Sequence, residues 1–203
     1  MRITLIDAGK RFNRDWIFRH LHYEFKEGHT YAITGSNGSG KSTLLQVIGG
    51  AIGISEGSAK YQDPEISVEQ VYKQMAIAAP YLELIEEMTA TEFLQFHQSF
   101  KPLLPACSIP DILTLVGLGN AANKQMRYYS SGMRQRARLA QAIFSDTPVV
   151  LLDEPCTNLD SEGIALYRQL IRDYCGGRMV IVSSNDTQEY DFCEHTLSIM
   201  DYK

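Results

Sequence analysis

The chain has 203 residues, which is enough to bury a sizeable core and to hold one domain with an insert. It contains no apolar run of membrane-spanning length and does not begin like a signal peptide, so we expect an intracellular protein that is not itself a channel. The formal net charge of −5 argues against non-specific nucleic-acid binding, and no specific nucleic-acid partner is expected.

The first elements alternate between apolar and polar residues. Ile3–Leu5 and Leu21–Phe25 have this pattern and are followed by a turn at Glu27–Gly28, which predicts antiparallel strands at the edge of the fold. Two aromatic residues, Phe12 and Trp16, lie between these strands. Each is either half-buried core of a hairpin or a flat surface on which a ligand ring stacks, because aromatic side chains bury large areas in both settings.

A glycine-rich loop follows the next apolar run. Gly35–Ser42 fits the pattern G-x-x-x-x-G-K-[ST] and lies between the strand-like run Tyr31–Ile33 and the helix-like run Leu44–Ile48, the context that a phosphate loop requires. That context disfavours the alternative of a glycine-rich hairpin with a chance lysine. The residues predicted to hold a nucleotide here are Gly35, Ser36, Asn37, Gly38, Ser39, Gly40, Lys41, Ser42 and Thr43.

Each residue type in this loop has a chemical reason. Glycines permit turns that direct successive backbone N–H groups at phosphate oxygens, at the start of a helix whose dipole also favours anions. Lys41 is expected to neutralise the β- and γ-phosphates, and the Ser42 hydroxyl is a suitable oxygen ligand for Mg²⁺.

The segment from about residue 76 to residue 130 has a helical pattern. Thr89–Glu92 and Ser108–Asp111 have the spacing of capping boxes or close variants, and three prolines punctuate the segment. At its end, Ser130, Ser131 and Gly132 precede an apolar stripe of helical period. These three residues are therefore expected at a helix N-terminus, where free N–H groups donate hydrogen bonds to an anion, although an ordinary serine N-cap is the alternative.

Three arginines, Arg134, Arg136 and Arg138, alternate with this stripe. They are expected to turn away from the core and to form a solvated helix face.

The apolar run Val149–Leu152 predicts a parallel strand that is buried on both faces. It ends in Asp153 and Glu154, at the strand end where ligands of open α/β sheets bind. Asp153 is expected to hold Mg²⁺ directly or through water, and Glu154 is the natural general base for an attacking water. Taken alone, the run could equally be any strand that stops at a solvated turn. Met179–Val182 and Thr196–Met200 predict two further strands.

Three of these stretches, in this order, resemble the phosphate loop, signature and acidic strand of ATP-binding cassette (ABC) ATPases: Gly35–Thr43, Tyr129–Gln135 and Val149–Pro155. The signature departs from the usual Leu-Ser-Gly-Gly-Gln, since Tyr129, Ser131 and Met133 replace Leu, Gly and Gln. In the family, the signature of one subunit holds the γ-phosphate bound by the other.

The resemblance implies further roles. Thr157–Asp160 resembles the D-loop that crosses the dimer interface, with Asp160 its most specific residue. Asn185 stands where the family carries a switch histidine, and an amide donates a hydrogen bond but does not titrate. Phe12 fits the adenine-stacking position by its distance from the phosphate loop, with Trp16 as competitor. No glutamine occurs near Ala79–Tyr81, where the family's glutamine loop should fall, so no residue is assigned to that role.

The implied fold class is α/β: a phosphate-loop NTPase (RecA-like) core with a mainly parallel sheet, an antiparallel β edge subdomain and an inserted helical subdomain at approximately 76–130, in one domain over 1–203. The implied function is ATP binding and hydrolysis, with Mg²⁺, in a membrane transporter. Such subunits work as head-to-tail homodimers or pseudo-dimers on a separate transmembrane permease, at the cytoplasmic face of the membrane. The four cysteines lack metal-ligand spacing and are expected to be reduced thiols.

Other functions stay open at this point. The absent glutamine and Asn185 favour a regulatory or scaffold module that binds ATP but hydrolyses it slowly, whereas the intact Glu154 argues against one. A small-molecule kinase would need an acceptor site and a lid in place of the signature. Repair or chromosome ATPases of the cassette class carry a long coiled-coil insert, which this chain lacks.

Overall fold

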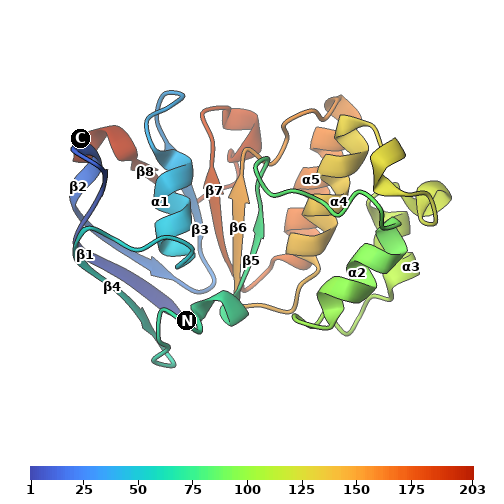
Figure 1. Ribbon diagram of the computed structural model, residues 1–203, viewed down its shortest axis with the longest axis horizontal. Helices are drawn as coiled ribbons and strands as arrows, with labels where there is room; N and C mark the ends of the chain where they lie inside the picture. Colours follow the sequence, from blue (N-terminus) through green and yellow to red (C-terminus); the bar gives the residue numbers. More distant parts are fainter.

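The computed structural model describes residues 1–203 and contains two β-sheets flanked by helices (Figure 1). In chain order the strands and α-helices are β1 (Arg2–Phe12), β2 (Asp15–Lys26), β3 (Thr30–Thr34), α1 (Lys41–Ile48), β4 (Glu56–Gln62), β5 (Met75–Ala78), α2 (Ala90–Gln98), α3 (Ile109–Leu115), α4 (Ser131–Ile143), β6 (Val149–Asp153), α5 (Ser161–Tyr174), β7 (Met179–Ser183) and β8 (His195–Ser198).

The larger sheet is entirely parallel, with strand order β5-β6-β7-β3-β8. It is covered on both faces, so its central strands β6 and β7 are fully buried and consist almost wholly of apolar residues. Alternate residues of β6 enter different cores: Val149 and Leu151 pack in the cluster that contains α1, and Val150 and Leu152 in the one that contains α4 and α5. The predicted α/β fold with a mainly parallel sheet is confirmed.

The smaller sheet has the order β2-β1-β4 and is antiparallel. Ile3 lies opposite Phe25 and Leu5 opposite Tyr23, so the predicted antiparallel arrangement of these strands is confirmed. These inward side chains share a core with α1, so the antiparallel sheet covers the helix that follows the phosphate loop (Figure 1).

The helical segment lies beyond α4, on the far side from α1 (Figure 1). Both predicted capping boxes are present, on α2 with Thr89 and Glu92 and on α3 with Ser108 and Asp111. The start of the segment differs from the expectation, because Met75–Ala78 form β5 and pair with β6, and the first regular helix begins only at Ala90.

The last strand is also shorter than predicted. Residues 196–200 were expected to be extended, but β8 ends at Ser198 and a 3₁₀ helix covers Ile199–Tyr202. Ile199 is completely buried, and its side chain lies against the positions of Gly35 and Gly40 in the phosphate loop. The chain therefore turns at Ser198 because burial of Ile199 over the loop outweighs continuation of an edge strand.

All four cysteines are free thiols. No helix in the structure is both long enough and apolar enough to traverse a bilayer.

Candidate functional site

The phosphate loop joins β3 to α1. Gly40 is the residue before α1 and has a φ of 97°, and a Cβ there would lie 2.1 Å from Ile17 Cγ2, so only glycine fits. Lys41 is buried, and its Nζ donates hydrogen bonds to the carbonyl oxygens of Gly35 at 3.0 Å and Ser36 at 3.2 Å. The predicted loop residues thus wrap around one lysine ammonium at the N-terminus of α1.

The carboxyl end of β6 brings Asp153 beside this helix. Asp153 is only 2% exposed, and its Oδ1 has no hydrogen-bond partner. Burial raises the pKa of this carboxyl, whereas a hydrogen bond with Ser42 acts in the opposite direction. A buried carboxylate oxygen that lacks a partner, next to a serine hydroxyl, suits a hard cation such as Mg²⁺, so the two predicted metal ligands fit the ion.

Glu154 follows with an unusual backbone. Its φ is 42°, in the left-handed region, and its N–H donates to the carbonyl oxygen of Ser183 at 2.9 Å. Glu154 lines a cavity of about 310 Å³ together with Asn37 and Asn185. Asn185 Nδ2 donates to Asn37 Oδ1 at 3.0 Å. The structure therefore gathers the predicted base, the switch position and a phosphate-loop residue around one space.

The signature residues open into a different cavity, of about 530 Å³. Ser130 caps α4, its Oγ accepting the N–H of Met133 at 3.2 Å, and both Ser130 and Ser131 are exposed. A Cβ on Gly132 would lie 3.0 Å from the carbonyl oxygen of Asn158. Asp160 lines the same cavity and caps α5 by accepting the N–H of Gly163 at 2.8 Å.

Within one chain, the predicted residues thus form two separate groups. The cavity of Glu154 and Asn185 and the cavity of the signature and Asp160 have only Leu159 in common. Phe12 stands apart from both groups, at the β1–β2 turn, and is 48% exposed, with Lys10 Nζ over its ring at 4.9 Å from the centroid. The ring of the competing Trp16 is contacted by Arg19 at 4.1 Å and Arg11 at 5.4 Å.

The expectation of a solvated arginine face on α4 is wrong. Arg134, Arg136 and Arg138 are all half-buried, and each donates to a backbone carbonyl of the preceding segment. The clearest case is Arg138, whose Nε donates to Leu82 O at 2.9 Å. Irregular backbone leaves carbonyls without partners, and these guanidinium groups satisfy them.

Two residues near the site were not predicted. Tyr81 follows β5 at the place where no glutamine was found, and its pKa is raised to about 12 by burial first and by the nearby Asp153 carboxylate second. Glu189 is a buried acid whose Oε1 accepts the Cys156 N–H at 2.8 Å, which anchors the chain just after Glu154. Tyr81 follows β5 and Asp153 ends β6, so knowledge that these two strands pair would have pointed to Tyr81. No pattern in the sequence points to Glu189.

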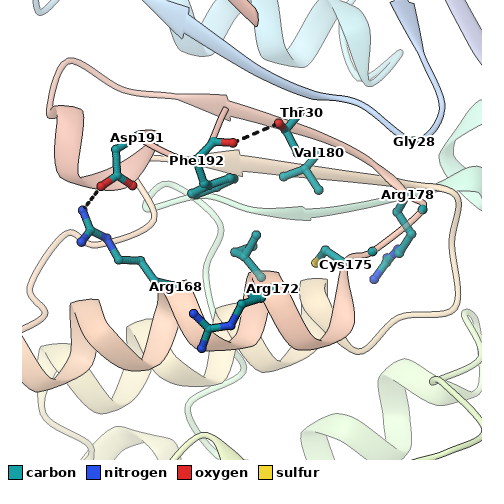
Figure 2. Close-up of a pocket in the computed structure, with 12 residues that line it drawn as sticks. Gly28, Thr30, Arg168, Arg172, Cys175, Arg178, Val180, Asp191 and Phe192 are labelled. Carbon is teal, nitrogen blue, oxygen red and sulfur yellow. Dashed lines mark hydrogen bonds and ion pairs between the residues drawn. The ribbon is translucent and has the colours of Figure 1, made fainter. Parts of the chain in front are cut away.

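A further cavity, of about 440 Å³, lies between α5 and the amino ends of β3 and β7, away from all of the predicted site residues (Figure 2). Its floor is apolar, with Val180 and Phe192, and an Arg168–Asp191 ion pair closes one side. Arg178 at the other side donates to backbone carbonyls, so most of the charge around this cavity is already paired.

The fold and the phosphate loop define a nucleotide-binding protein of the phosphate-loop class. The sequence profile of the family described as ABC transporter matches residues 18–157. The chain is 28% identical over 189 residues to the uncharacterized ABC transporter ATP-binding protein YybJ of Bacillus subtilis, covering 92% of this chain and 87% of the relative. It is 32% identical over 177 residues to the cytochrome c biogenesis ATP-binding export protein CcmA of Nitrobacter winogradskyi, covering 84% of each.

Among solved structures, the dimeric post-hydrolysis state of the ATP-binding cassette MJ0796 bound to ADP and Pi superposes with a TM-score of 0.82 at 24% identity, over 97% of this chain and 93% of that one. This likeness confirms the fold. The chain belongs to the ABC transporter family, as one of its ATP-binding proteins.

Proposed function

We propose that this chain is the ATP-hydrolysing subunit of an ABC transporter and that it works as a head-to-tail homodimer. The observation that carries the proposal is the division of the site residues between two cavities of one chain. A nucleotide on the phosphate loop leaves the signature cavity of the same chain unused. In a head-to-tail dimer, the exposed N–H groups of Ser130, Ser131 and Gly132 would reach the γ-phosphate held by the partner.

The proposed roles follow the chemistry of each group. Lys41 neutralises the phosphates, Ser42 and Asp153 hold Mg²⁺, and Mg²⁺ when bound supplies positive charge on the phosphate oxygens. Glu154 takes a proton from the attacking water, and Asn185, held by Asn37, donates a hydrogen bond to a phosphate oxygen. Phe12 stacks on adenine, which is supported by its 48% exposure, while the ring of Trp16 is already contacted by two arginines.

We further propose that residues 1–203 act as one ABC ATPase domain with the helical insert between β5 and α4, docked on a separate permease at the cytoplasmic face of the membrane. The relatives named as ATP-binding proteins of transporters support this context.

The shared-site mechanism is tested by mixing two inactive variants. Lys41→Ala removes the phosphate-loop charge, and Gly132→Asp places a carboxylate in the signature, against Asn158 O. Each homodimer would lack two functional sites, but a mixed dimer would regain one. ATPase activity in the mixture, absent from either variant alone, is the expected result. A mixture as inactive as its components, although both fold, would rule out the shared site.

A further inference from the structure

Three side chains with metal-binding atoms meet at the amino ends of β3 and β8, at the opposite end of these strands from the phosphate loop. His29 precedes β3, Glu194 precedes β8, and His195 is the first residue of β8. One ring nitrogen from each histidine and one carboxylate oxygen all lie within 4.8 Å of one another. None of the three belongs to the nucleotide site described above.

Backbone hydrogen bonds and strand pairing hold the three residues in position. The carbonyl oxygen of His29 accepts the Val180 N–H at 3.1 Å, and the Glu194 N–H donates to Thr30 O at 3.1 Å. His195 is paired with Tyr31 in the β3–β8 ladder, and its ring stacks on that of Tyr31 with centroids 5.1 Å apart. The three donor groups are therefore brought together by the folded sheet, so little ordering is needed to bring them around an ion.

The local charges also suit a cation. His29 Nδ1 lies 2.7 Å from Glu194 Oε2, so one imidazole and the carboxylate of the cluster are already in contact. The ammonium group of Lys26, which lines the same cavity as His29 and His195, pairs with Glu24 at 2.9 Å. The cluster thus offers two imidazoles and one carboxylate, with its neighbouring positive charge already neutralised.

We propose that His29, Glu194 and His195 form a binding site for a divalent transition metal, with Zn²⁺ as the best match. Zn²⁺ binds histidine nitrogen and carboxylate oxygen in sites with three protein ligands, and water completes the coordination. Mg²⁺ and Ca²⁺ prefer all-oxygen sites and would compete poorly. The ion would link the edge strand β8 to β3, the strand that leads into the phosphate loop (Figure 1). It would thereby stabilise the pairing of these two strands.

The test is calorimetric titration of Zn²⁺ into the untagged, nucleotide-free chain, with excess Mg²⁺ present to occupy oxygen-rich sites. We expect one site per chain. His29→Ala, Glu194→Gln and His195→Ala should each weaken it at least ~10-fold, since even loss of a residue that only supports a ligand costs about 10- to 100-fold in metal affinity. Zn²⁺ should also raise the Tm and slow hydrogen exchange of the β8 amides, and both effects should disappear in the three variants.

A matched control comes from the chain itself. His20 and His22 flank Asp7 in a second exposed cluster, where His20 Nδ1 lies 2.8 Å and His22 Nε2 3.7 Å from the same Asp7 oxygen. His22→Ala should leave Zn²⁺ affinity unchanged.

The proposal is overturned if wild type shows no Zn²⁺ site, if the His29, Glu194 and His195 variants bind as tightly as wild type, or if His22→Ala is the change that abolishes binding. All of these side chains are at least partly exposed, and an unchanged circular dichroism spectrum checks that each variant folds.

Discussion

Asn185 illustrates how a single residue sets the chemistry of the proposed site. Its amide nitrogen donates to Asn37 Oδ1, so it is tied to the phosphate loop from the end of β7. An amide in this position provides a hydrogen bond whose strength does not change with pH, unlike an imidazole.

For the variant Asn185→Ala we expect ATP turnover to fall roughly 10- to 100-fold, because a hydrogen bond to a charged group contributes about 1.5–3 kcal/mol. Asn185→His should restore activity and introduce a pH dependence around the imidazole pKa of about 6.5, which the wild type should lack. Steady-state ATPase rates over that range are the measurement, with the exposed Asn120→Ala as control. Turnover of Asn185→Ala equal to wild type would mean that the side chain does not reach the phosphate.

Asp153, unlike Asn185, is an ionisable residue, and its buried charge lowers the stability of the fold. Burial raises its pKa above the unfolded value, so the stabilising protonated form is present at low pH and is lost as the pH rises through the folded pKa. Near neutral pH and without a cation, the ionised carboxylate is therefore expected to destabilise the chain.

Asp153→Asn should accordingly raise the Tm of the nucleotide-free protein near neutral pH. The difference from wild type should shrink as the pH is lowered toward about 4, where the unfolded carboxyl also takes up a proton. The Asp153→Asn substitution should also remove most of the stabilisation that Mg²⁺ and ATP together confer on wild type. Thermal melts with and without Mg·ATP measure both effects, and the exposed Asp15→Asn serves as control. Equal melting temperatures for Asp153→Asn and wild type under every condition would contradict this account.

Among the elements, the junction of α4, β6 and α5 depends on one guanidinium group. Arg178 donates to the carbonyl oxygens of Ile143 at 2.6 Å, at the end of α4, and of Ser145 at 2.9 Å and Thr147 at 2.7 Å, in the connection between α4 and β6. The Ser145 carbonyl also accepts the Thr147 N–H at 2.9 Å, whereas the carbonyls of Ile143, at the helix end, and Thr147, before the sheet, depend on the guanidinium group.

Arg178→Met is expected to lower the free energy of unfolding by about 3 kcal/mol, since it removes the donor from the carbonyls of Ile143 and Thr147. Arg172 is the matched control, because it lines the same cavity but is exposed and pairs only with Asp173, at 3.4 Å (Figure 2). Arg172→Met should change stability by less than about 0.5 kcal/mol. Urea unfolding of both variants decides the question, and equal effects would show that the Arg178 hydrogen bonds contribute nothing particular.

For the whole molecule, the proposed mechanism rests on the separation of the predicted site residues of one chain into two groups. Asn37 of the phosphate loop and Glu154 line one cavity, and the signature and Asp160 line another. The proposed shared site therefore predicts that two copies associate when nucleotide is bound and not yet hydrolysed.

Glu154→Gln should therefore bind ATP and Mg²⁺ but stall before hydrolysis, and should elute from a sizing column as a dimer. The double variant Lys41→Ala with Glu154→Gln should remain monomeric, because the phosphate-loop charge that retains ATP is missing. A Glu154→Gln protein that is saturated with ATP and yet strictly monomeric would argue strongly against the dimer.

The features that could be predicted from the sequence are those that depend on local residue order. The phosphate loop needs its glycines and Lys41 within a few residues, the capping boxes need three-residue spacing, and the buried strands need uninterrupted apolar runs. Family resemblance rested on the same short motifs. The error at residues 199–200 arose because apolar residues in an edge strand and apolar residues folded over a loop give the same local pattern.

The remaining features were decided by the tertiary structure, because they join residues that are distant in the chain. The strand order places Tyr81 beside Asp153, the turn after β7 brings Glu189 to the Cys156 amide, and the β3–β8 pairing assembles His29 with Glu194 and His195. The arginines of α4 were misjudged for the same reason, since the carbonyls that they satisfy belong to other segments. Sequence periodicity reports which side chains are buried, but only the packing of elements determines which groups meet.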